Sequence, residues 1–292
     1  MAEAAKSLIK DAVRILIAAG VESASTDARI LLQFATGITR EELLRDPDQQ
    51  FPDRKIELFT SLIRRRATRE PVSHLLGRRE FWGLSFVVNA DVLDPRPDSE
   101  TLIEALLGRL ENKSDRLRIL DLGTGSGCLL LSLLHELPNA WGLGIDLSEK
   151  ALVTARGNAE QLEMSSRATF CRAIWTAPLT GVFDIVISNP PYIEEEQIVC
   201  LAPEVRQHEP RIALSGGHDG LQAYREIARD ISSLMVVDGW LAVECGAGQW
   251  SDVASIFATD KLRAEPAIDD LGGVARVFLA QAIEGLFSIE NN

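Results

Sequence analysis

From Arg118 onward, short apolar segments alternate with segments of helical periodicity. We expect strands at 118–122, 140–146, 168–172, 184–188, 240–244 and 276–280, and helices at 128–136, 148–163 and 221–237. Strands and helices that alternate in this way form a mostly parallel sheet with helices on both faces. The sequence therefore predicts an α/β domain, with its ligand site at the carboxyl ends of the strands.

The first 76 residues differ, because their periodicity is helical throughout. Apolar residues recur every three to four positions from Leu8 to Ala19, and a second such stripe runs from Ile56 to Ile63. Thr39 and Glu42 have the spacing of a capping box, in which each side chain accepts a hydrogen bond from the other residue's backbone amide. These signals predict a small helical bundle.

Between the bundle and the α/β region, residues 77–98 mix aromatic and β-branched side chains around Gly83, a pattern typical of a hairpin or an extended linker. A proline-rich segment then interrupts regular structure, and Asp98 or Ser99 is placed to cap a helix that runs from Thr101 to about Leu110. We therefore expect three parts, at 1–76, 77–98 and 99–292.

Composition limits the partners and cofactors. The chain carries 43 acidic and 30 basic residues, a net charge of −13, so nucleic-acid phosphates are repelled on average. Its four cysteines are scattered without a CxxC pair, which argues against a disulfide framework or a zinc site and is typical of a reducing cytosol. The sequence has no run of about 18 apolar residues. We expect a cytoplasmic monomer with no metal, no membrane span and no direct nucleic-acid contact.

One concentration of positive charge stands out, formed by Arg64, Arg65, Arg66, Arg69, Arg78 and Arg79. Runs of charge usually mark the solvated face of a helix. The alternative is a contact with an acidic or RNA-bound partner, and the sequence leaves both interpretations open.

A glycine-rich loop follows the first strand of the α/β region and reads Asp121-Leu-Gly123-Thr124-Gly125-Ser126-Gly127. Glycines let the backbone approach a ligand closely, and the helix that follows offers N–H groups at its start. The spacing G-x-G-x-G differs from the G-x-G-x-x-G that seats a dinucleotide pyrophosphate. A tight turn between strand and helix, without a ligand, is the simpler alternative.

Two carboxylates flank this loop. Asp146 ends the next strand, where an acid can bond the two hydroxyls of a ribose; otherwise it caps the strand end before Ser148. Asp121 precedes the glycines and is placed to anchor the amino group of a methionine moiety, directly or through water. Glycine spacing and Asp146 together favour an adenosine ligand without a pyrophosphate, such as S-adenosylmethionine.

The tetrad Asn189-Pro190-Pro191-Tyr192 follows the apolar strand at 184–188. Two prolines fix their φ angles and cannot donate backbone hydrogen bonds, so the turn is rigid and exposes acceptors. The Asn189 side-chain oxygen and the Pro190 carbonyl suit a planar NH2 group, and Tyr192 adds an aromatic face for the substrate plane or a sulfonium charge. A proline turn that merely ends a strand is the alternative.

These acceptors suit methyl transfer to a planar nitrogen by direct in-line displacement on a sulfonium. An amide nitrogen is a poor nucleophile, since its lone pair is delocalised into the carbonyl. Holding both N–H bonds aims the nitrogen at the methyl carbon, and the same acceptors face the positive charge that develops there. Asn189, Pro190 and Tyr192 are therefore the candidate catalytic residues, and the chemistry needs no metal.

The ordered set of motifs resembles the bacterial HemK/PrmC family, N5-glutamine methyltransferases of class I peptide chain release factors. The set comprises Ser25-Thr-Asp-Ala-Arg29, Pro71-Val-Ser-His-Leu75, Glu80-Phe-Trp82, Arg96-Pro-Asp-Ser-Glu-Thr-Leu102, the glycine loop, Asn189 to Ile193, Glu209-Pro210, Gly216-Gly217 and Asp219-Gly-Leu221. The tetrad alone also occurs in adenine-N6 methyltransferases.

The resemblance implies a Rossmann-like class I methyltransferase domain behind a hairpin linker and an N-terminal bundle that contacts the release factor. It implies that the glutamine of the release factor's GGQ motif is methylated, with S-adenosyl-L-homocysteine as the second product. Cofactor contacts are implied at Gly123 to Gly127, Asp146, Trp175 and Asn189, and the substrate glutamine is implied to bind Asn189, Pro190, Pro191 and Tyr192.

One position departs from the family pattern. An Asp-Trp pair is usual after the third strand, where the acid can bond the adenine amine, but this chain has Ile174-Trp175. Trp175 is still expected to pack against adenine, unless it is a core tryptophan.

Three other functions share part of this pattern. A glutamine methyltransferase of a ribosomal protein has the same tetrad and differs in the N-terminal region. An adenine methyltransferase of nucleic acid flips a base toward similar acceptors, but the negative charge and the lack of a target-reading module argue against it. A noncatalytic adenosine-binding regulator would keep the glycine loop without needing Asn189 or the prolines.

Overall fold

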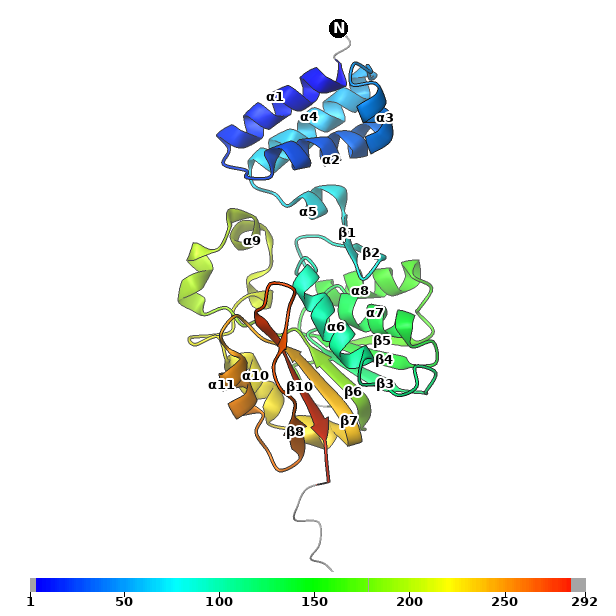
Figure 1. Ribbon diagram of the computed structural model, residues 1–292, viewed down its shortest axis with the longest axis vertical. Coiled ribbons are helices and arrows are strands. Elements are labelled where there is room, and N and C mark those ends of the chain that lie inside the picture. Colours follow the sequence, from blue (N-terminus) through cyan, green and yellow to red (C-terminus); the bar gives the residue numbers. More distant parts are fainter. Residues whose placement is uncertain (1–3, 178, 285–292) are drawn as a thin grey trace, which may run out of the picture. The chain divides into compact units, whose positions relative to one another are not determined.

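The computed structural model describes residues 4–177 and 179–284. By its internal contacts the chain forms two units (Figure 1): Met1–Arg78 with Ala202–His208, and Arg79–Leu201 with Glu209–Asn292. We describe each unit by itself. The short segment at 202–208 was not expected in the first unit.

The first unit is a helical bundle, as the sequence predicts. Its helices are α1 (Ala5–Ala18), α2 (Ala24–Thr36), α3 (Arg40–Arg45), α4 (Asp53–Ala67), α5 (Val72–Leu76) and, from the later segment, α9 (Pro203–His208). The predicted stripes of α1 and α4 meet a stripe of α2 in one apolar core, which includes Leu16, Leu31 and Phe59. The Thr39–Glu42 capping box is present, with both hydrogen bonds formed.

The arginine run is not a uniformly solvated face. Arg64 and Arg65 are exposed on α4, but the Arg66 side chain is only 6% exposed and pairs with Asp27 Oδ2 of α2 at 2.8 Å and Glu204 Oε1 of α9 at 2.9 Å. Arg69 binds Glu204 as well, at 2.6 Å. Although burial acts in the opposite direction, the bonds from Arg69 and Arg66 lower the pKa of Glu204 to about 2. Two arginines of the run therefore join α9 to the bundle.

The second unit is built on one sheet, in the order β5-β4-β3-β6-β7-β10-β8, with β9 paired to β10. Its strands are β3 (Arg118–Leu122), β4 (Trp141–Asp146), β5 (Ala168–Arg172), β6 (Phe183–Ser188), β7 (Met235–Glu244), β8 (Leu262–Ala264), β9 (Ile268–Asp269) and β10 (Ala275–Ala282). Neighbours from β5 to β7 pair in parallel, and β10 is antiparallel to β7. This is the predicted mostly parallel α/β sheet.

Alternate residues of each strand enter cores on opposite faces of the sheet. Ile119, Ile185 and Ile187 pack on one face against α6 (Glu100–Leu107), α7 (Cys128–Glu136) and α8 (Glu149–Gln161). Leu120, Leu122 and Val186 pack on the other face against α10 (Gln222–Ala228) and α11 (Trp250–Ile256). Short 3-10 turns complete the unit: η1 (Pro97–Ser99), η2 (Glu195–Cys200), η3 (Arg211–Ala213) and η4 (Ile231–Leu234).

A hairpin stands at the expected position of the linker, formed by β1 (Arg78–Phe81) and β2 (Leu84–Val87). Its two-residue turn has positive φ at both Trp82 (52°) and Gly83 (69°), the backbone that matches the twist of a tight hairpin. Phe81 and Phe86 meet edge to face, with ring centres 6.3 Å apart, inside the core beside α6. The hairpin is therefore packed against the core of the α/β unit.

Two predicted elements end elsewhere. The helix predicted at 221–237 stops at Ala228, η4 follows, and β7 already begins at Met235. The apolar spacing of Ile227, Ile231 and Leu234 continues across the break, because all three side chains enter the same core, so periodicity alone was misleading. The helix predicted to reach Leu110 ends at Leu107, before Gly108.

We expect Arg66→Met to destabilise the first unit by about 3 kcal/mol, because it leaves the Asp27 carboxylate buried without its cation. Urea unfolding of the full chain, followed by circular dichroism, measures the change as a lower midpoint. Arg64→Met is the matched control on the exposed side of α4, and its midpoint should stay unchanged. Equal midpoints for both variants would contradict the structural role of the Arg66 pairs.

Candidate active site

The glycine loop is held between the carboxyl ends of β3 and β4. The backbone amides of Gly123 and Thr124 donate to the Ile145 carbonyl at 2.9 and 2.8 Å, and the Gly125 amide donates to Asp146 Oδ2 at 3.0 Å. All three glycines of the loop have positive φ, between 55° and 80°, where a β-carbon would be strained. The loop conformation therefore depends on the glycines that the sequence places there.

The two carboxylates beside the loop have different surroundings. Asp121 is 1% exposed, and burial raises its pKa to about 7 even though Thr124 Oγ1 donates to its Oδ2 at 2.6 Å. Its Oδ1 atom is buried and has no hydrogen-bond partner among the described residues. Burial also raises the pKa of Asp146, which accepts from the amides of Gly125 and Ser148. Asp121 thus holds the glycine loop through Oδ2, and its Oδ1 can accept a hydrogen bond from a further donor.

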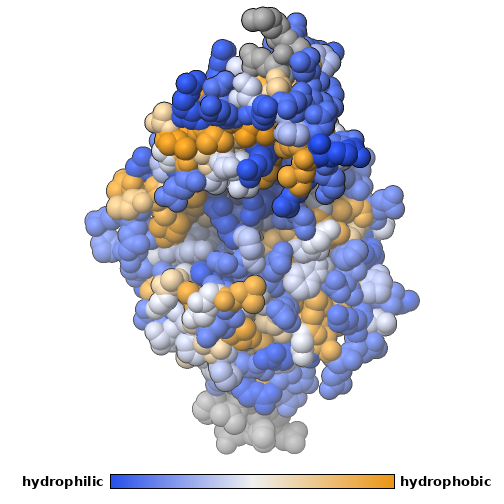
Figure 2. Space-filling model, turned by 45° about the horizontal axis from the view of Figure 1, so that its top comes forward, coloured by the Kyte–Doolittle hydropathy of each residue, from blue (hydrophilic) through white to orange (hydrophobic). Residues whose placement is uncertain are grey.

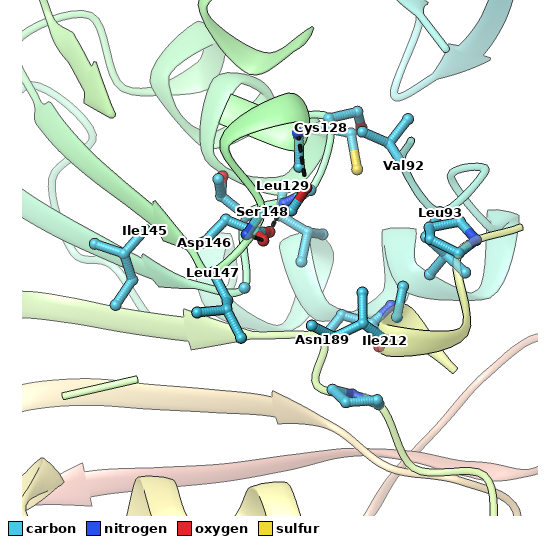
Figure 3. A pocket seen from close by; sticks show the side chains of 18 of the residues that line it. Val92, Leu93, Cys128, Leu129, Ile145, Asp146, Leu147, Ser148, Asn189 and Ile212 are labelled. Carbon is cyan, nitrogen blue, oxygen red and sulfur yellow. Dashed lines mark hydrogen bonds between the residues drawn. The ribbon is translucent and has the colours of Figure 1, made fainter. Parts of the chain in front are cut away.

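A cavity of about 160 Å³ opens at the carboxyl ends of these strands (Figure 3). Its wall comes from the loop after β2, the glycine loop, the end of β4, the segment after β5, the loop after β6 and η3. Most of the wall is apolar, with a few polar groups such as Asp146, Ser99 and Asn189. A hollow of this kind is the usual form of a small-molecule site.

Eight residues of the predicted site line this cavity: Gly123, Thr124, Gly125, Ser126, Asp146, Trp175, Asn189 and Pro191. Gly127, Pro190 and Tyr192 are not part of its wall. The fold therefore brings the glycine loop and the tetrad to one cavity, although they lie far apart in the sequence. The roles assigned to the single residues remain predictions.

The position of Trp175 agrees in part with each of its two interpretations, a contact with adenine and a tryptophan of the core. It lines the cavity, and a β-carbon on Gly123 would stand 3.5 Å from its ring. The ring also packs against the core on the α10 side, and its Nε1 donates to Glu226 Oε2 at 2.7 Å. Its φ is +47°, an uncommon value for a large residue. Ile174, where the family has an acid, is exposed and lines the same cavity.

The tetrad is tied to a buried carboxylate. Asn189 Nδ2 donates to Ser99 Oγ at 3.1 Å, and Ser99 Oγ donates to Glu244 Oε2 at 2.5 Å. The Tyr192 hydroxyl donates to Glu244 Oε1 at 3.3 Å, so that Asn189 and Tyr192 are both connected to Glu244. The aromatic contact with substrate or sulfonium that was predicted for Tyr192 stays a prediction.

Sequence reasoning missed Ser99 and Glu244 as parts of this site. Ser99 was taken as a helix cap, but its side chain makes no capping bond to α6. Glu244 ends the apolar strand β7 as Asp146 ends β4, and that position was the signal that could have identified it. Arg96, which lines the cavity and pairs with Glu209 at 2.6 Å, was also missed.

Known proteins that resemble this chain are methyltransferases, which agrees with the glycine loop and the tetrad at one cavity. Residues 7–77 match the PrmC N-terminal domain, and residues 90–210 match the methyltransferase small domain. A release factor glutamine methyltransferase of Caulobacter vibrioides is 43% identical, over 94% of this chain and 93% of the relative. One of Rhodospirillum rubrum is 44% identical, over 90% of this chain and 80% of the relative.

The chain belongs to the release factor glutamine methyltransferase family. Its fold is also found in the catalytic domain of hMettl16, solved in complex with the MAT2A 3′UTR hairpin 6, at a TM-score of 0.54 and 18% identity over 76% of this chain and 81% of that one. A likeness at this identity concerns the fold alone. Together with the match to the methyltransferase small domain, this likeness shows that the α/β unit has a Rossmann-like methyltransferase fold, as the resemblance implied.

Within residues 4–177 and 179–284, none of the helices is long and apolar enough to cross a membrane. No group of three or more His, Cys, Asp or Glu side chains is placed to hold a metal ion in that part of the chain.

We expect Asp146→Ala to weaken the affinity for S-adenosylmethionine about tenfold or more, equivalent to at least ~1.4 kcal/mol, because a hydroxyl partner and two loop contacts are lost together. Calorimetric titration measures the affinity, and Asp146→Asn, which keeps one carbonyl acceptor, should lose less. Asp252→Ala on α11 is the surface control. An affinity unchanged in Asp146→Ala would remove this residue from the cofactor site.

Proposed function

We propose that the protein transfers a methyl group from S-adenosylmethionine to the side-chain amide nitrogen of the glutamine in the GGQ motif of class I peptide chain release factors. The observation that carries the proposal is the meeting of the glycine loop, Asp146 and Asn189 at one cavity. The first two suit an adenosine ligand, and Asn189 suits a planar nitrogen. Relatives at 43% and 44% identity bear the name of this activity.

The residues around the cavity fit this cofactor. The Asp146 carboxylate faces the cavity, where it can accept from ribose hydroxyls. Asp121 is not part of the cavity wall, but its buried Oδ1, which has no partner among the described residues, suits an ammonium donor. Trp175 and Ile174 supply apolar wall for adenine, and no polar side chain replaces the family's acid at position 174. When bound, S-adenosylmethionine supplies an electrophilic methyl group on a positively charged sulfur.

The tetrad orients the substrate amide. Because Asn189 Nδ2 already donates to Ser99, its Oδ1 is the atom available to accept one N–H bond of the glutamine. The Pro190 carbonyl is the proposed acceptor for the other N–H bond. Two fixed acceptors hold the nitrogen in one direction and face the positive charge that grows on it, so they act more strongly as the reaction proceeds.

The first unit is the proposed contact with the release factor. Figure 2 shows apolar side chains gathered in places on a mostly hydrophilic surface. Of the large apolar side chains that are exposed, Ile17 of α1 (63%) and Leu44 of α3 (74%) belong to the helical bundle. The net charge of −13 favours a protein partner over a phosphate backbone, and exposed apolar side chains of the bundle are available for such a contact.

Mass spectrometry of a purified release factor, incubated with the protein and S-adenosylmethionine, tests the substrate. We expect a gain of one methyl group on the peptide that contains the GGQ glutamine, and none on a release factor in which that glutamine is replaced by Ala. Ribosomal proteins and DNA are incubated in parallel. A methyl group found only on one of these would overturn the proposal in favour of that substrate.

Asn189→Ala should lower kcat on the release factor about 100-fold or more, because removal of one oriented polar group in a site of this kind typically has that effect. S-adenosylmethionine should still bind with largely intact affinity in calorimetry, since the loop and Asp146 remain. Asn112→Ala, in an exposed turn, serves as the control with full activity. Full activity of Asn189→Ala would show that the assigned grip on the amide is wrong.

A further inference from the structure

Glu244 and Ser99 are two buried groups that form hydrogen bonds with the tetrad and that the proposed reaction has not used so far. Glu244 is 1% exposed and Ser99 is 2% exposed, and they come from different elements, β7 and η1. Their hydrogen bonds form one chain, from Asn189 Nδ2 to Ser99 Oγ and from Ser99 Oγ to Glu244 Oε2, with the Tyr192 hydroxyl on Glu244 Oε1.

The chain of bonds has a direction that the chemistry of its members dictates. An ionised carboxylate can only accept hydrogen bonds, so the single proton of the Ser99 hydroxyl points to Glu244. Ser99 Oγ is then left to accept, and only the NH2 end of the Asn189 amide can donate to it. The amide oxygen is therefore turned away from Ser99.

This direction matters because the two ends of an asparagine amide have nearly the same shape and opposite hydrogen-bonding character. Presented to a substrate NH2 group, the oxygen attracts and the NH2 end repels. Asn189 lines the cavity and is labelled in Figure 3. The hydrogen bond to Ser99, and not the substrate, therefore decides which end of the Asn189 amide is free to face a substrate nitrogen.

The surroundings of Glu244 bear on its charge. The pKa of Glu244 is raised, chiefly by burial, and the negative charge of Asp98 acts in the same sense. The hydrogen bond from Ser99, the positive charge of Arg276 on β10 and the hydrogen bond from Tyr192 act in the opposite sense. Arg276 is itself held by Asp270 at 2.9 Å, so its guanidinium is fixed near the carboxylate. In such a dry site each of these bonds is stronger than in water.

We propose that Glu244, acting through Ser99, sets the orientation of the Asn189 amide so that its oxygen faces the substrate nitrogen. Glu244 and Ser99 are then positioning residues for methyl transfer, because they act through the Asn189 amide. The hydrogen bond to Tyr192 lets the same carboxylate fix the other end of the tetrad. This inference rests on the proposed function, because it assumes that the substrate presents an NH2 group.

Glu244→Gln is the sharpest variant, since it changes one atom and keeps the shape. If the new amide accepts from Tyr192 as before, its NH2 end faces Ser99 and donates to it. The Ser99 proton is then released toward Asn189, whose oxygen turns to meet it. The arrangement that instead leaves Asn189 unchanged would take the acceptor away from the part-buried Tyr192 hydroxyl, which costs free energy.

We expect Glu244→Gln and Ser99→Ala each to lower kcat on the release factor about 100-fold, with affinity for S-adenosylmethionine and the unfolding temperature close to those of the unmodified protein. The double variant should be no slower than the slower single one, because both changes break the same chain. Glu160→Gln, exposed on α8, is the matched control. Losses that multiply in the double variant, or full activity of either single variant, would overturn the proposal.

A second readout needs no substrate. The side-chain amide resonances of Asn189 can be assigned by nuclear magnetic resonance through their disappearance in Asn189→Ala. They should move in both Glu244→Gln and Ser99→Ala and stay in place in Glu160→Gln. If the unmodified protein fails to methylate the release factor, the proposed function fails while these resonances still decide the orientation of Asn189. Unmoved resonances would refute the positioning role even in an active enzyme.

Discussion

The parallel pairing of β3 with β4 on one side and β6 on the other is the constraint on which the site depends. Parallel strands bring their carboxyl ends to the same edge of the sheet, so the loops after β3, β4 and β6 are neighbours whatever their distance in the sequence. The register aligns Leu122, Ile145 and Ser188, each of which is the last or next-to-last residue of its strand. Apolar cores on both faces hold the strands in this order, and the cavity follows from it.

Carboxylates at or next to the ends of β3, β4 and β7 organise this edge of the sheet. Asp121 holds Thr124 of the glycine loop, Asp146 holds the Gly125 amide, and Glu244 holds Ser99 and Tyr192. Burying a carboxylate costs free energy unless donors surround it, and each of these has donors from a neighbouring loop. A loop that moves away leaves a buried carboxylate without its hydrogen-bond donors. The free-energy cost of burying the carboxylate therefore favours the ordered conformation of the loop.

Much of this fold could be predicted from the sequence because the relevant signals are local. Strands β3 and β5 and helix α7 were placed at their observed bounds, since apolar runs bounded by glycine or polar residues specify them. The break between Ala228 and Met235 was missed, because a helix, a 3-10 turn and a strand share one apolar face there.

The candidate site was predictable where one short motif carries the chemistry, and not where partners are distant. The segments 123–127 and 189–192 are short, contiguous motifs that can be identified in the sequence. The bonds that connect Ser99 to Glu244 and Arg66 to Glu204 join residues more than a hundred positions apart. Such pairings follow from the packing of whole elements, which neither periodicity nor charge pattern specifies.

Because α9 belongs to the first unit, the N-terminal segment alone does not contain the whole bundle. The matched N-terminal domain ends at residue 77, yet one carboxylate of the bundle, Glu204, comes from the chain between β6 and β7. A fragment cut after Arg78 would lack that carboxylate, and Asp27 would be the one carboxylate of the two that still pairs with Arg66. Chimeras that exchange bundles between relatives therefore have to exchange residues 202–208 along with the N-terminal part.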